Sequence, residues 1–175
     1  MADQEGISLE HAIDRYGWQS AFSRLASSVR TTSPGAFAGA RIEDTGGSIS
    51  FKGAVPDEAQ YIIDSFRSDY GGVTVELHTD MGYSETEVDA AVKAVHYALL
   101  RESDVADVGT SFESETATVI ADVVLAGPVP DTALAELTAL AQEKVAALGL
   151  ADRLGVTVTR TKSVGGDDGD IAQVG

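Results

Sequence analysis

Along the first half of the chain, the spacing of apolar residues changes between the period of a helix and that of a strand. Helical spacing predicts a helix over about residues 8–30, and alternation predicts strands near residues 37–43 and 48–52. A second helix after Asp57 and a third strand over residues 73–77 complete the order α-β-β-α-β. The first helix has its apolar face at Leu9, Ala12, Ile13, Tyr16, Phe22, Leu25 and Val29.

The same order returns after residue 80, with a helix after Ser84, strands near residues 108–113 and 116–125, a second helix, and a last strand containing Val156 and Val158. We expect the second helix to turn Leu134 and Leu148, among others, inward. Three sequence matches occur in the same order in both halves: Gly39 with Gly109, Gly53–Asp57 with Gly127–Asp131, and Val73–Val75 with Val156–Val158. They indicate an internal duplication.

The predicted fold class is therefore α+β, a tandem duplication of an α-β-β-α-β unit, each a three-stranded sheet with two helices on one face. We place the units at residues 1–80 and 81–163. Residues 164–175 have no hydrophobic period and are rich in Gly and Asp, which predicts a flexible acidic tail.

Local signals predict how the elements begin and end. Asp44–Gly47 has the composition of a hairpin turn. Asp57 and Gln60 are spaced as a helix capping box, and Ser84 and Glu87 as another. The only tryptophan, Trp18, is expected to pack in or beside the core.

Composition limits the partners. The 175 residues carry a formal net charge of −16, which disfavours nucleic acid and anionic membrane surfaces. No apolar run approaches the roughly 20 residues that cross a bilayer, so we expect no membrane insertion. The segment Met1–Glu5 is acidic, which predicts no secretory signal peptide in this chain.

We find no catalytic motif and expect the protein not to be an enzyme. The sequence lacks cysteine, and its serines lie in neither Gly-x-Ser-x-Gly nor Ser-x-x-Lys. The histidines His11, His78 and His96 form no ligand pair at metal-binding spacing, and the acidic run Asp167–Asp170 is not followed by the glutamate that closes a calcium loop. We therefore expect no metal and no cofactor.

Several stretches resemble the propeptide region of secreted chymotrypsin-like (streptogrisin and α-lytic-type) serine proteases of actinobacteria, without the peptidase domain. The stretches are Tyr16–Trp18, Phe37–Glu43, Phe51–Pro56, Ala94–Leu100 and Val164–Asp168. The resemblance implies a secreted or extracytoplasmic prosegment that binds a chymotrypsin-like protease domain, either of the same precursor or of another protein. Such prosegments act as intramolecular chaperones and inhibitors.

On this interpretation the last strand pairs with the protease by β-augmentation, and the following segment lies across its cleft. The predicted partner-binding residues are Val156, Thr157, Val158, Thr159, Arg160, Thr161, Lys162, Val164, Gly165 and Gly166. A second resemblance leaves another function open. The stretch from Ser48 to Val75 is similar to the BON module, which is also α-β-β-α-β and is associated with cell envelopes, so a tandem envelope or ligand-binding module is the alternative.

Overall fold

The computed structural model describes the backbone of residues 9–127, 130 and 132–161, and side chains from residue 17 onward within those ranges. The predicted α+β fold class, with a repeated α-β-β-α-β arrangement, is confirmed. Contacts within the chain separate two compact units, residues 1–90 and 91–175, and the division falls inside one helix.

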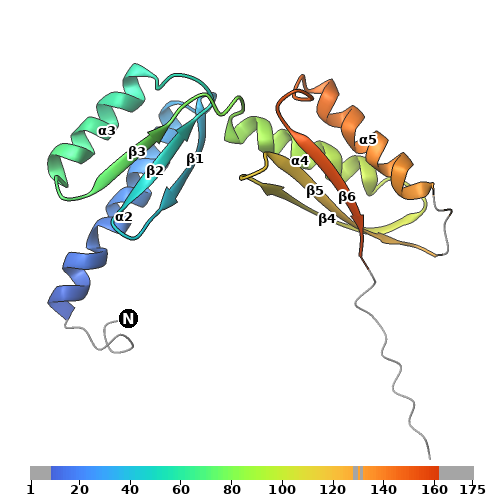
Figure 1. Ribbon diagram of the computed structural model, residues 1–175, viewed down its shortest axis with the longest axis horizontal. Coiled ribbons are helices and arrows are strands. Elements are labelled where there is room, and N and C mark those ends of the chain that lie inside the picture. Colours follow the sequence, from blue (N-terminus) through green and yellow to red (C-terminus); the bar gives the residue numbers. More distant parts are fainter. Residues whose placement is uncertain (1–8, 128–129, 131, 162–175) are drawn as a thin grey trace, which may run out of the picture. The chain divides into compact units, whose positions relative to one another are not determined.

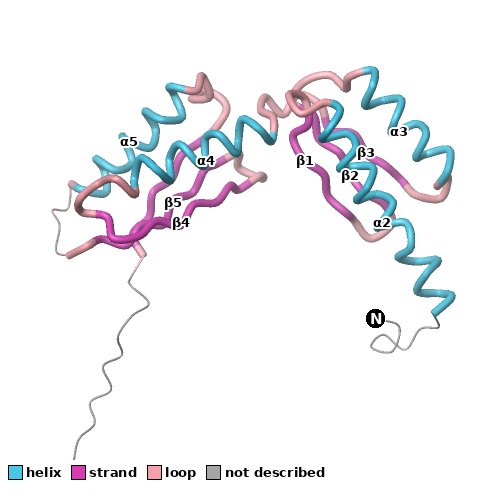
Figure 2. Tube along the Cα trace, turned by 180° about the vertical axis from the view of Figure 1, so that it is seen from behind, coloured by secondary structure: helices cyan, strands magenta, loops and turns pink. Residues whose placement is uncertain are grey.

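The first unit contains α2 (Leu9–Thr32), β1 (Phe37–Ile42), β2 (Gly46–Phe51), α3 (Asp57–Asp69) and β3 (Thr74–His78). The strands form one sheet in the order β1-β2-β3, with β1 antiparallel and β3 parallel to β2. Both helices cover one face of this sheet (Figures 1 and 2). The core lies between these layers and contains Trp18, Phe22, Val29, Phe37, Ile49, Phe51, Ile63 and Phe66.

The second sheet has the same topology, with strand order β4-β5-β6. Its strands are β4 (Val105–Glu113), β5 (Thr118–Leu125) and β6 (Gly155–Arg160), and its helices are α4 (Glu85–Leu99) and α5 (Ala133–Ala147). Strand β4 is antiparallel and β6 parallel to β5. Figure 2 shows α4 and α5 in front of the strands, so the helices again share one face.

Strand register supports two of the three sequence matches between the units. Phe37 pairs with Phe51 and Val105 pairs with Leu125, and a bulge follows Phe37 and Val105 alike. Phe51 and Leu125 each stand two residues before the matched glycine of the following loop. The same register places Val75 and Val158 at equivalent positions on the third strands.

The match between Gly39 and Gly109 fails. In this register the pair Gly109–Asp122 corresponds to the pair Arg41–Ser48, so Gly109 is equivalent to Arg41. The second hairpin is longer than the first, and the equal spacing of the two glycines was a coincidence of sequence.

The predicted hairpin turn at Asp44–Gly47 is also partly wrong, because Gly46 and Gly47 belong to β2. Neither glycine has room for a Cβ. At Gly46 the added atom would clash with the carbonyl oxygen of Thr74, and at Gly47 it would lie 2.6 Å from Phe22 Cε2. These glycines therefore serve close packing within the sheet and against α2.

Of the two predicted capping boxes, one is confirmed. The Ser84 amide donates to Glu87 Oε2 at 2.8 Å, and the Glu87 amide donates to Ser84 Oγ at 3.3 Å. The box at Asp57 and Gln60 is wrong: Pro56 is the N-cap without a side-chain cap bond, and Gln60 donates to Asp64 instead. Asp57 lies in the first turn, where its charge still favours the helix dipole.

The inward-facing positions of α5 are buried at Ala133, Leu137, Ala141 and Val145. Leu148 was expected inward but is 44% exposed. The helix ends at Ala147, and Gly149 has a φ of +72° that reverses the chain. Leu150 then reaches the core and is 1% exposed.

Candidate functional site

Each sheet has two edge strands, and three of these four edges are modified in ways that discourage pairing with another chain. Strands β1 and β4 each contain a bulge. Each bulge lies at the start of its strand, where it leaves one residue unpaired and twists the edge, while residues 39–42 of β1 and 107–113 of β4 keep a regular register.

The edge of β3 is covered by a side chain from α3. Arg67 Nη2 donates to the carbonyl oxygen of Val75 at 2.7 Å, and Arg67 Nη1 lies 3.4 Å from Asp64 Oδ1. The guanidinium therefore occupies a main-chain acceptor that an added strand would need.

Neither feature occurs on β6 in the part of the chain that the structure describes. The register of β6 with β5 is continuous. Counting from the matched glycines Gly53 and Gly127, the position of Arg67 is held by Ala141, a fully buried residue without a donor. Among the described residues, β6 is thus the edge strand that has neither a bulge nor a covering arginine.

Two hydrogen bonds show which main-chain groups of β6 point toward β5 and which point away from it. The amides of Gly155 and Thr161 donate to the carbonyl oxygens of Ala117 and Val123, both at 2.9 Å. Because the pairing side alternates along a strand, Val156, Val158 and Arg160 direct their N–H and C=O groups away from β5. The equivalence of Val158 with Val75, whose carbonyl points outward to Arg67, supports the same assignment.

The predicted partner-binding residues divide between this strand and the segment after it. Val156 to Arg160 lie in β6 and Thr161 directly follows it, with Val158 buried and Val156 half-buried. Thr157, Thr159 and Arg160 are exposed, and Thr159 Oγ1 donates to Asp122 Oδ1. The predicted residues Lys162, Val164, Gly165 and Gly166 lie outside the described residues, as does the tail.

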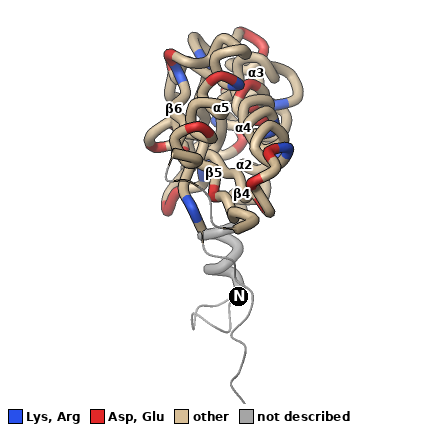
Figure 3. Tube along the Cα trace, turned by 90° about the vertical axis from the view of Figure 1, so that its right-hand side faces the viewer, with Lys and Arg blue, Asp and Glu red and all other residues tan. Residues whose placement is uncertain are grey.

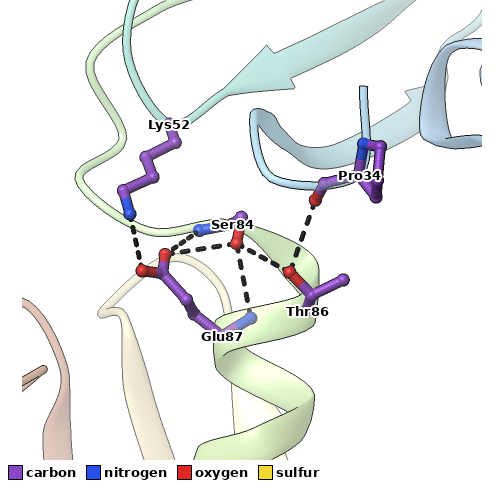
Figure 4. Close-up of polar contacts among 5 residues, drawn as sticks. All are labelled: Pro34, Lys52, Ser84, Thr86 and Glu87. Atoms are coloured by element: carbon purple, nitrogen blue, oxygen red, sulfur yellow. Dashed lines mark hydrogen bonds and ion pairs between the residues drawn. The ribbon is translucent and has the colours of Figure 1, made fainter. Parts of the chain in front are cut away.

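A polar cluster surrounds the start of α4, within residues 1–90 (Figure 4). Lys52 Nζ lies 2.5 Å from Glu87 Oε1, and Ser84 Oγ contacts both Glu87 Oε2 and Thr86 Oγ1. Thr86 Oγ1 also donates to the carbonyl oxygen of Pro34 at 3.4 Å. Because Ser84 is 1% exposed and its hydroxyl is used in capping, the cluster holds the helix start and is not a nucleophile–base pair.

The charge of Glu87 is maintained by this cluster. Partial burial raises the pKa of the carboxyl group, but hydrogen bonds from Lys52 and Ser84, together with the Lys52 charge, outweigh it and leave the pKa below its ordinary value. The ion pair with Lys52 therefore persists into mildly acidic solution.

The histidines described with side chains do not come together. His78 is exposed on β3, whereas His96 Nδ1 lies 3.3 Å from Thr110 Oγ1. Within the described residues there is no group of three His, Cys, Asp or Glu side chains that could hold a metal ion. No described helix is long and apolar enough to span a bilayer.

No protein-family model matches this chain, and no curated protein matches it.

Sequence reasoning missed Arg67, which distinguishes the β3 edge from the β6 edge. An arginine in the last turn of a helix is an ordinary surface residue by pattern. The available signal was the comparison of the two repeats, in which this arginine aligns with an alanine.

Proposed function

We propose that the protein is a non-enzymatic, prosegment-like binding protein that pairs β6 with an extended segment of a chymotrypsin-like serine protease, as folding chaperone and inhibitor. The open edge of β6 carries the proposal. It is the one edge in the described residues that has neither a bulge nor a covering arginine.

Strand addition supplies affinity through main-chain hydrogen bonds and needs no particular side chain on the partner. The outward N–H and C=O groups of Val156, Val158 and Arg160 offer this ladder. Residues 162–166 follow Thr161, so a paired β6 would bring them to the partner surface. The choice of a protease as the partner rests on the sequence resemblance.

The test removes one outward donor while leaving the sheet intact. Arg160→Pro deletes an N–H that faces away from β5, which proline tolerates at an edge. Arg160→Ala is the matched control, because it removes the same charge and keeps the N–H. Inhibition of a streptogrisin-type protease should weaken about tenfold in the proline variant, roughly 1.4 kcal/mol, and change little in the alanine variant.

Equal inhibition by both variants would contradict pairing through β6. If the intact chain neither inhibits the protease nor raises its refolding yield, the protease proposal itself is wrong. The second candidate, a tandem BON-like envelope or ligand-binding module, would then be the better account. The α-β-β-α-β order of each unit favours that candidate.

A further inference from the structure

A groove lies between α4 and α5 within the second unit. Its volume is about 410 Å³, in the range of small-molecule sites. The lining residues come from both helices and the turn after α4: Lys93, Ala94, Tyr97, Ala98, Arg101, Glu102, Leu140 and Lys144. The two alanines, both half-buried, leave the space that larger side chains would fill.

In the first unit, aromatic side chains fill the equivalent space between the two helices. There α2 packs on α3 through a chain of aromatic rings. Phe22 and Phe66 meet edge to face with centroids 6.2 Å apart, and Phe66 stacks on Tyr70 at 4.8 Å.

The same helix register can be followed in the second unit. Counting from the matched glycines aligns buried Ala59 with buried Ala133 and buried Ile63 with buried Leu137. This register gives Leu140 the position of Phe66 and Lys144 the position of Tyr70. The second unit therefore has a leucine and a lysine, beside an open groove, where the first unit has a stacked aromatic pair.

The groove gathers cations in a strongly acidic chain. The chain has 28 acidic and 12 basic residues, and Figure 3 marks those that the structure describes along the Cα trace. Yet three of the twelve basic residues of the chain line this one groove. Lys144 lies 2.8 Å from the exposed Glu143, a pair of little energetic weight. Lys93 and Arg101 form no ion pair with any described residue.

The lining also offers apolar surface. Lys93, Tyr97 and Arg101 are spaced four residues apart and so form one stripe along α4 and the turn after it. Tyr97 is 58% exposed and lies on this stripe between Lys93 and Arg101. Glu102 is the one carboxylate of the lining and reduces the local positive charge without cancelling it.

We propose that this groove binds a small organic anion, a carboxylate or phosphate ester whose apolar body lies against Tyr97, Ala94, Ala98 and Leu140. Arg101 would hold the anionic group with its planar fork, and the lysines would add charge. A polyanionic partner is disfavoured, because each further negative charge meets the field of a chain with net charge −16. A ligand with one or two charges avoids most of this repulsion.

Amide NMR shifts of the full-length protein, titrated with phenyl phosphate, 4-phenylbutyrate and neutral benzyl alcohol, test the proposal. Both anions should give saturable shifts over residues 93–102 and 140–144, with a dissociation constant of about 1 mM or below. The tighter of the two identifies the preferred anionic group. Benzyl alcohol should bind at least about fivefold more weakly, or roughly 1 kcal/mol.

Variants separate the groove from general charge effects. Arg101→Gln should weaken anion binding about fivefold. Arg24→Gln removes the same charge from an exposed position on α2 and should leave anion binding unchanged. Lys144→Tyr, which introduces the residue that the first unit has at the equivalent position, should weaken binding as well. Equal binding of benzyl alcohol, equal effects of Arg101→Gln and Arg24→Gln, or no saturable shift with either anion would overturn the proposal.

Discussion

Replacing Gly47 by alanine would place a methyl group inside the core of the first unit. The added Cβ would lie 2.6 Å from Phe22 Cε2 and 2.8 Å from the carbonyl oxygen of Arg41, where ordinary contact begins at 3.4 Å. The Phe22 ring cannot easily retreat, because it is 1% exposed and contacts both Trp18 and Phe66 edge to face. We therefore expect a clear loss of stability.

Overpacking of a core by a methyl group costs about 1–3 kcal/mol. For a unit of this size, that corresponds to a fall in melting temperature of about 5–20 °C. Urea unfolding followed by tryptophan fluorescence measures the loss of stability of the first unit, since Trp18 is the only tryptophan and its ring contacts Phe22.

Gly72→Ala is the matched control. Gly72 is exposed, and no atom lies within 4 Å of its added Cβ, so the variant should stay within about 0.5 kcal/mol of the wild type. If Gly47→Ala proves as stable as Gly72→Ala, Gly47 does not pack against Phe22. The sequence-based interpretation of Gly46 and Gly47 as turn residues would then be correct.

Three further changes probe other parts of the molecule. The pKa of Glu87 is lower in the folded state than in the unfolded state. Its charge therefore stabilises the unit of residues 1–90 fully at a pH above the unfolded pKa, and this stabilisation is lost as the pH falls through the folded pKa. The urea midpoints of wild type and Glu87→Gln should therefore differ at neutral pH and converge in acid, and a constant difference would contradict this. Arg67→Ala should free the β3 edge and increase self-association in sedimentation experiments; a variant as monomeric as the wild type would show that the arginine does not protect the edge. Truncation after Thr161 should leave the melting curve nearly intact, since the described core ends at Val158, yet raise the inhibition constant at least about tenfold. Unchanged inhibition would exclude a contribution of residues 162–166.

The parts of the fold that sequence predicts well are those fixed by neighbouring residues. Apolar spacing located all the described helices and strands to within a few residues, and the Ser84–Glu87 capping box involves one helical turn. The glycine and proline loop before α3 and its partner before α5 also identified the repeat, because their backbone requirements are local.

The errors arose where contacts distant in sequence decide the outcome. Gly46 and Gly47 have turn composition, but their role follows from Thr74 and Phe22 across the unit. Leu148 continues a helical period, but Gly149 ends it and Leu150 fills the core instead.

The candidate sites depend on distant contacts still more strongly. The sequence identified β6 as a strand with a possible free edge, but not that the other three edges are modified. The groove between α4 and α5 was not predicted at all, because Lys93, Tyr97 and Lys144 have ordinary surface patterns in the sequence. The groove is seen only in the structure, and its difference from the first unit follows from comparing Leu140 and Lys144 with the equivalent residues Phe66 and Tyr70.

Residue-resolved hydrogen exchange across β6, with and without an inactive active-site-serine variant of a streptogrisin-type protease, tests the central claim most directly. In the free protein the amides of Val156, Val158 and Arg160 should exchange fast, while those of Thr157 and Thr159, which face β5, exchange slowly. Binding should slow exchange at the three outward amides. A complex in which these three amides still exchange at the rates of the free protein would contradict pairing through β6.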